Sequence, residues 1–420
     1  KPLRAYALRM ILPAATTTIA SALHLLQLIQ VNPTNALTIK SAKWVKPSAS
    51  NSAINLNSLT PPRSGHVTFR SDSGDNYIFG GYVEEFSKSE ETGLTRYVTN
   101  DLWKWDNEKL EWHLCDVLLD DDVPGPRLAT AAAVVNGQPT LFGGWDPQEA
   151  GTGGIILDTV HQLDLSTMKW NFLKDVRIPD GPTSRHVALA LPCNKAADEQ
   201  KQQSVVLIHN HRCIDHVILF ESDKSSNECT FRKQKTSGSP PSSRGLHVAA
   251  LLQDQKHVVI FGGAAQDGNM SNEVFVLDIE SWDWRKIQVV NDGPIPTPRA
   301  GACLCTFSED SVLLFGGAER SNEGGLNPRA DLWELKLDCS AGTASWSLVL
   351  DDDGDSADCG LPPPRNAATF CEVTPPTLLL ESSQANDSDP GRYFVLQGGW
   401  APFKKTWAET TFLRVEIGDD

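Results

Sequence analysis

Short apolar runs, separated by turns rich in Gly, Pro, Asp and Asn, fill the chain after residue 46. Each run is nearly continuous rather than alternating, which is typical of β-strands covered on both faces. Long stretches with helical periodicity are absent from this part of the sequence, which argues against an α/β arrangement. The pattern therefore predicts an all-β fold.

The strand-like runs recur as a unit of four, and this unit occurs six times. Each unit opens with a turn that ends in Arg, and its second strand ends in a glycine pair in five of the six units. The third run usually ends in an acid, and the fourth opens with an aromatic residue. The unit arginines, 55 to 66 positions apart, are Arg63, Arg127, Arg185, Arg244, Arg299 and Arg365. This spacing predicts the blades of a β-propeller.

The third unit departs from the pattern. Ile208-His209-Asn210 stands where the other units have their glycine pair, and Phe231 replaces the expected Trp. We still expect a blade here, because Arg185, a second strand over 204–208 and a third run over 217–221 are in place.

The order of glycine pair, acid and Trp resembles the kelch repeat, and the resemblance covers residues 42–417. It implies a six-bladed kelch-type β-propeller over residues 42–420. The sixth unit ends without a Trp strand, while an unused one lies at 42–46 and contains Trp44. The resemblance therefore implies that the N-terminal strand completes the last blade, which removes two open sheet edges.

Residues 1–41 read as a short N-terminal extension outside the propeller. Residues 1–35 contain Lys1, Arg4 and Arg9, many hydroxyl side chains and no acid, which is typical of a targeting peptide. A packed helix is the second interpretation, and an adaptor remnant resembling an F-box is the third. Polar residues interrupt the apolar run at 10–29 too often for a membrane span. We expect a cytoplasmic protein, or an organellar or secreted one if residues 1–35 are a targeting peptide.

The charge and the cysteine content argue against nucleic-acid partners and against disulfides or a structural zinc site. The net charge is −16, and residues 72–420 carry 29 basic and 53 acidic side chains, or −24. This charge disfavours nucleic acid, because it repels a phosphate backbone. Nine cysteines without a Cys-x-x-Cys pair indicate reduced thiols rather than disulfides or structural zinc.

The candidate binding site is the mouth at which the first strands begin. Arginines at this place in kelch substrate adaptors bind acidic peptides, so the resemblance implies that the six unit arginines bind a partner's carboxylates. The alternative interpretation is architectural, with each Arg bonded to backbone carbonyls where the chain enters its blade. Three aromatic residues that follow glycine pairs, of a type common in binding hot spots, are added to the site: Tyr82, Trp145 and Trp400.

A weak metal candidate lies in the irregular third unit. His209, His211 and Cys213 would share one side of a strand, and their atoms suit zinc or copper. An ordinary polar loop is the simpler interpretation, and we expect no cofactor. The tyrosine and carboxylate patterns of copper- and iron-binding kelch enzymes are missing.

We therefore expect a non-catalytic module that binds a peptide or loop of a partner protein. A kelch-type oxidase, lyase or isomerase and a ubiquitin-ligase adaptor are the alternatives.

Overall fold

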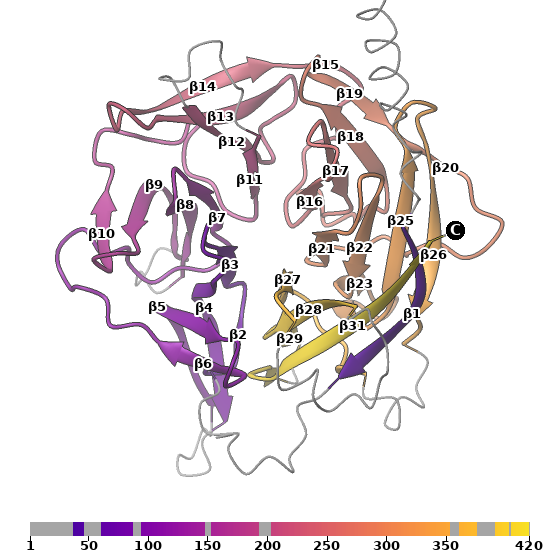
Figure 1. The fold of residues 1–420 in the computed structure, drawn as a ribbon, viewed down its shortest axis with the longest axis horizontal. Coiled ribbons are helices and arrows are strands. Elements are labelled where there is room, and N and C mark those ends of the chain that lie inside the picture. The colour runs from indigo at the N-terminus through magenta and orange to yellow at the C-terminus, as the bar shows by residue number, and fades with distance from the viewer. Residues whose placement is uncertain are drawn as a thin grey trace, which may run out of the picture.

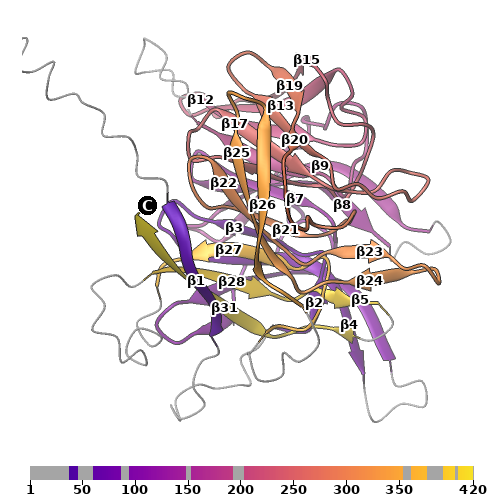
Figure 2. The same cartoon turned by 90° about the vertical axis from the view of Figure 1, so that its right-hand side faces the viewer.

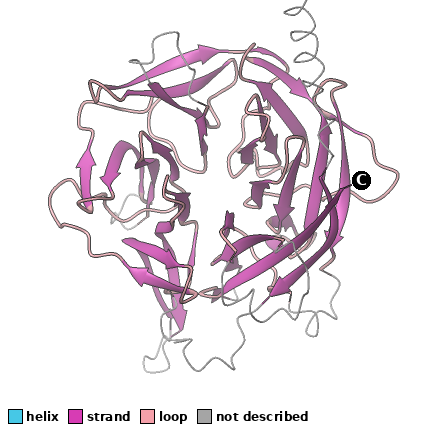
Figure 3. Cartoon of the chain, viewed as in Figure 1, coloured by secondary structure: helices cyan, strands magenta, loops and turns pink. Residues whose placement is uncertain are grey.

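The computed structural model describes residues 37–45, 60–86, 94–147, 153–192, 203–352, 361–375, 391–402 and 405–419. The predicted extension up to residue 36 lies outside these ranges. Every regular element in the described part is a strand (Figure 3). No helix there is long and apolar enough to cross a membrane.

Six mainly antiparallel sheets stand around a central axis, which confirms the predicted six-bladed propeller (Figure 1). Blade one contains β2 (Arg63–Ser64), β3 (Val67–Arg70), β4 (Asn76–Phe86), β5 (Leu94–Asp106) and β6 (Glu111–Leu114). Blade two contains β7 (Ala131–Val135), β8 (Gln138–Asp146), β9 (Ile155–Asp164) and β10 (Lys169–Phe172). Blade three contains β11 (Val187–Leu191), β12 (Gln203–His209), β13 (His216–Asp223) and β14 (Cys229–Lys235).

The other three blades follow the same plan with small additions. Blade four contains β16 (Val248–Leu251), β17 (His257–Phe261), β18 (Val274–Asp278) and β19 (Asp283–Lys286), with β15 (Ser237–Gly238) at its edge. Blade five contains β21 (Cys303–Thr306), β22 (Ser311–Phe315), β25 (Leu332–Asp338) and β26 (Thr343–Leu350), with β20 (Gln288–Val289) at its edge. Blade six contains β27 (Thr369–Val373), β28 (Arg392–Gln397), β31 (Thr410–Asp419) and β1 (Leu37–Val45).

Two short ribbons extend from the loops between second and third strands. They are β23 (Ala318–Arg320) with β24 (Leu326–Pro328), and β29 (Trp400–Ala401) with β30 (Lys405–Thr406). The hairpin of β4 and β5 is lengthened on the same face of the propeller (Figure 2).

The N-terminal strand closes the ring as predicted. β1 pairs antiparallel with β31, so that Trp44 lies opposite Leu413 and Val45 opposite Phe412. Trp44 is buried, and its ring lies 5.2 Å from the ring of Phe315 in blade five. The strand begins at Leu37, on the N-terminal side of the predicted run at 42–46.

The hydrophobic core consists of six clusters, one at each seam between blades. At most seams, the aromatic residue before a glycine pair packs edge-on against the fourth-strand aromatic of the next blade. Phe79 meets Trp170, for example, with ring centroids 5.4 Å apart. At the seam of blades three and four, His209 takes this place against Trp284 at 5.6 Å. The irregular third unit therefore keeps the ring-to-ring contact between neighbouring blades, with a histidine in place of the phenylalanine.

Each glycine pair lies in contact with the backbone segment that leads into the next blade. A Cβ on Gly80 would lie 2.7 Å from the carbonyl oxygen of Arg127, and the residue has a φ of +66°. The following N–H, from Gly81, donates to that same oxygen at 2.9 Å. Only a residue without a side chain fits here, because the approach is backbone to backbone.

Candidate functional site

Five of the six predicted arginines are buried inside the blades, with exposed fractions between 0% and 4%. Arg63 shows the arrangement in full. Its Nη1 donates to the carbonyl oxygen of Gly80 at 2.9 Å, and both terminal nitrogens donate to the Asp101 carboxylate at 2.9 Å. Burial raises the pKa of Asp101, but the hydrogen bonds from Arg63, Trp103 and Thr99 and the charge of Arg63 together outweigh this effect and hold the pKa below its usual value. Arg63 thus joins the second and third strands of its own blade.

The same bond from the guanidinium to the first glycine carbonyl recurs in four other blades. In blade five, Arg299 donates to Gly316 O and forms a bidentate pair with Asp331, and both side chains are at most 2% exposed. Arg244 forms the corresponding pair with Glu273 at 2.9 Å. These arginines support the architectural interpretation, because their donors are directed to their own blade.

Among the described residues, no carboxylate lies as close to Arg127 or Arg365. Arg127 donates to the hydroxyl of Thr159 at 3.1 Å, and Arg365 lies 3.8 Å from the Glu409 carboxylate. Burial lowers the pKa of each guanidinium to about 10, so both remain charged near neutral pH. Arg365 also stacks on Trp407, with Cζ 4.9 Å from the ring centroid.

Arg185 occupies a different place in its unit from the other five arginines. In blade two, the second glycine N–H, from Gly144, donates to the carbonyl of Thr183, where other blades use the carbonyl of the next unit's Arg. Thr183 is fully buried and takes the arginine position in blade three. Thr183, two residues before Arg185, is therefore the residue that corresponds to the unit arginines of the other blades. Blade three has a threonine at that entrance position in place of the buried arginine.

Arg185 instead belongs to a ring of six backbone hydrogen bonds around the axis. One residue from each blade donates its N–H to the carbonyl of its neighbour, at 2.8 to 3.0 Å. The ring consists of Gly65, Ala129, Arg185, Leu246, Gly301 and Ala367, all with φ between +51° and +64°. Arg185 is the charged member, and its side chain is exposed.

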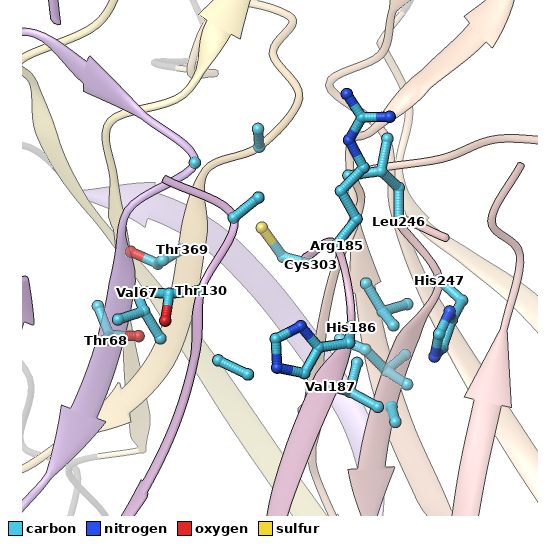
Figure 4. Close-up of a pocket in the computed structure, with 18 of the residues that line it drawn as sticks. Val67, Thr68, Thr130, Arg185, His186, Val187, Leu246, His247, Cys303 and Thr369 are labelled. Carbon is cyan, nitrogen blue, oxygen red and sulfur yellow. The ribbon is translucent and has the colours of Figure 1, made fainter. Parts of the chain in front are cut away.

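The ring surrounds one end of a central channel with a volume of about 300 Å³. Its wall is formed by the first strands and is mostly apolar, with Val67, Ala132, Val187 and Ala249 among the lining residues. In Figure 4 the Arg185 side chain extends past Leu246, away from the deeper part of the channel. Arg185 is the one Lys or Arg among the described residues that line this channel.

Three buried histidines follow the ring residues, and two of them link neighbouring blades. His66 Nε2 lies 2.9 Å from the Thr369 hydroxyl, and His247 Nε2 lies 3.1 Å from Nδ1 of His209. Burial lowers the pKa of His66 and His186 to about 3, and that of His247 to about 4. All three rings are therefore neutral at physiological pH.

Of the three predicted aromatics, Trp145 lies beside Arg185. The Arg185 Cζ is 5.8 Å from the Trp145 ring centroid, and the indole is half-buried. Tyr82 donates its hydroxyl to Glu84 at 2.8 Å, and burial raises its pKa to about 12. Trp400 pairs through its backbone with Asn366 in blade six. Trp145 is therefore the predicted aromatic for which the described residues show a contact with Arg185.

The weak metal candidates do not converge. His209 and Cys213 are buried, whereas His211 is exposed. Among the described residues, no three His, Cys, Asp or Glu side chains are grouped to hold a metal ion. His209 faces His247 and Trp284 across the blade seam, which is a packing role.

Sequence reasoning missed Thr183, the inter-blade histidines and Ile156, which lies opposite Trp145 in the β8–β9 hairpin. A signal for two of the histidines was present, since His66 and His247 each stand three residues after the Arg of their unit, whereas His186 directly follows Arg185. Thr183 and Ile156 carry no mark in the sequence.

The ring closure, glycine pairs and buried arginines together define a kelch-repeat propeller. The chain belongs to the family described as the KLHDC2/KLHL20/DRC7 Kelch-repeats domain, whose model matches residues 28–195 and 208–374.

Several curated proteins are similar over part of their length. Kelch domain-containing protein 1 of Homo sapiens is 23% identical over 288 residues, which cover 64% of this chain and 66% of that protein. Acyl-CoA-binding domain-containing protein 4 of Arabidopsis thaliana is 25% identical over 198 residues, or 47% of this chain and 28% of that protein. The chain thus spans less than a third of the latter relative.

A solved structure, titled "Structure of YjhT", shares the fold. It matches with a TM-score of 0.54 and 16% identity, and the match covers 86% of this chain and 98% of that one. Kelch-repeat relatives support a protein-interaction module as the general role of this domain.

Proposed function

We propose that this protein is a non-catalytic interaction module that binds a segment or loop of a partner protein at the mouth of its central channel. Arg185 is the anchoring residue in this proposal. The observation that carries it is the contrast among the arginines: five are buried and bonded within their blades, and Arg185 is exposed at the channel mouth.

The chemistry of Arg185 suits a carboxylate. Its guanidinium makes no hydrogen bond to any residue in the described ranges, while the Trp145 ring lies at 5.8 Å from Cζ. A guanidinium held against an aromatic ring keeps its edge donors available, and these match the two oxygens of a carboxylate. The rigid hydrogen-bonded ring beneath it reduces the entropy lost when a partner binds.

A charge reversal tests the proposal. Arg185→Glu should reduce capture of partner proteins from a cell extract at least tenfold, as measured by affinity purification and quantitative mass spectrometry. Lys224→Glu is the matched control, because Lys224 is exposed in the β13–β14 turn on the opposite face. Both variants should melt within about 2 °C of the parent protein. Equal capture by the parent protein and Arg185→Glu would refute the role of Arg185.

A further inference from the structure

An exposed apolar surface lies beside Arg185, on the hairpin formed by β8 and β9. Trp145 is anchored there by backbone hydrogen bonds in both directions with Leu128, each 2.9 Å long. The indole is also confined by Gly154, because a Cβ on that glycine would lie 2.3 Å from Trp145 Nε1. The ring next to Arg185 is therefore held in place by the chain around it.

Ile156 extends this surface. It is the direct antiparallel partner of Trp145, and such partners project from the same side of a two-stranded ribbon. Its side chain is 45% exposed, which is high for an isoleucine in a strand. The side of the ribbon that carries the indole toward Arg185 thus also carries an uncovered aliphatic side chain.

Within an acidic propeller, the ring at the mouth carries one positive side chain, that of Arg185. The other ring residues are Gly65, Ala129, Leu246, Gly301 and Ala367, none of which carries charge. Residues 72–420 hold 29 basic and 53 acidic side chains. A polyacidic segment would gain one ion pair at Arg185 and be repelled by the remaining charge. A segment with one carboxylate avoids this repulsion.

We infer that the mouth selects a partner segment in which a single Asp or Glu stands next to a bulky apolar residue. The carboxylate binds Arg185, and the apolar side chain packs on Ile156 and Trp145. This inference rests on the proposed function and adds the chemical class of the partner. Charge complementarity at Arg185 and the exposed aliphatic side chain beside it identify that class.

Selection from a phage-displayed library of random heptapeptides, with no free peptide carboxyl terminus, tests this inference on the full chain. The parent protein should enrich peptides with one acid next to Leu, Ile, Val, Met or Phe. Arg185→Ala should lose the acidic preference. Ile156→Thr keeps the branched Cβ and should retain the acidic preference but lose the apolar one, with about tenfold weaker affinity for the selected peptides in fluorescence polarisation.

Leu119→Ser is the matched control, because Leu119 is 84% exposed and lies in the linker after β6. It should select the same peptides as the parent protein. Enrichment of acidic peptides without an apolar neighbour, or unchanged selection by Ile156→Thr, would overturn the inference and leave the proposed function standing. Absence of any acidic preference that depends on Arg185 would overturn both.

Discussion

Replacing one buried arginine should destabilise the propeller strongly, whereas the same replacement at Arg185 should not. Arg299 is 1% exposed and donates five hydrogen bonds, to Gly316 O, both carboxylate oxygens of Asp331, and the carbonyl and hydroxyl oxygens of Thr297. Arg299→Met removes these donors and keeps most of the side-chain volume. Asp331, itself 2% exposed, is then left as a buried carboxylate without its cation.

The magnitude follows from that stranded charge. Breaking a buried ion pair by removing one partner costs about 3–5 kcal/mol, a large share of the about 5–15 kcal/mol that holds a typical domain folded. Trp333 Nε1 still donates to Asp331 at 2.7 Å, which limits the loss. Arg185→Met should change the unfolding free energy by no more than about 0.5 kcal/mol, since that side chain is exposed.

Urea unfolding followed by tryptophan fluorescence measures both variants, and the double variant Arg299→Met/Asp331→Leu completes the comparison. Removing both charges should recover much of the lost stability, because an apolar pair of similar volume often replaces a buried ion pair at little cost. The reasoning is refuted if Arg299→Met unfolds within about 1 kcal/mol of the parent protein, or if Arg185→Met is equally destabilised.

Three further predictions concern the ring and its seams. Stability should fall as the pH drops from 6.5 toward 4, because unfolded histidines bind protons there while the lowered pKa values of His66, His186 and His247 keep the folded rings neutral. The loss at pH 5 is about 2 kcal/mol for each histidine, measurable by urea unfolding at pH 7.5 and 5. His186→Gln should reduce this dependence, and a flat profile would contradict the assignment. Gly143→Ala should cost more than about 2 kcal/mol, because its Cβ would lie 2.4 Å from Thr183 O, whereas Gly293→Ala meets nothing within 4 Å and should be tolerated. Equal melting temperatures for these two variants would disprove the close approach. Trp44→Ala should cost about 3–5 kcal/mol, since the ring is buried against Phe315 and Phe370. A melting temperature unchanged from that of the parent protein would show that the closing strand contributes little.

The architecture was predictable because each sequence marker stands where the fold restricts the choice of residue. A glycine pair stands where the next blade's chain passes at contact distance, and a fourth-strand Trp fills the seam between two sheets. These needs recur in five of the six blades, so their repetition could be counted. The unpaired Trp44 strand at the start and the missing Trp strand at the end identified the closure.

The direction of each arginine was not predictable in this way. In some blades the inward guanidinium pairs with an acid about 30 to 40 residues later, such as Asp101 for Arg63 or Asp331 for Arg299. Arg127 turns inward without such a pair and bonds the carbonyl of Gly143, so the spacing of acids does not predict the direction. In the third unit, Ser184-Arg185 imitates the marker of the other units. The hydrogen bond from Gly144 to Thr183 shifts the register by two residues, and no sequence motif reports that bond.

The pairing of β1 with β31 sets an order of events during protein synthesis. Ser41 donates a hydrogen bond to Glu416 across 375 residues of chain, so the ribosome makes one partner long before the other. Until the late strand emerges, the nascent polypeptide exposes an unsatisfied edge and the apolar flank around Trp44. Ring closure is therefore a late step in the folding of this propeller, and the interval before it is the period in which chaperones would protect the chain from aggregation.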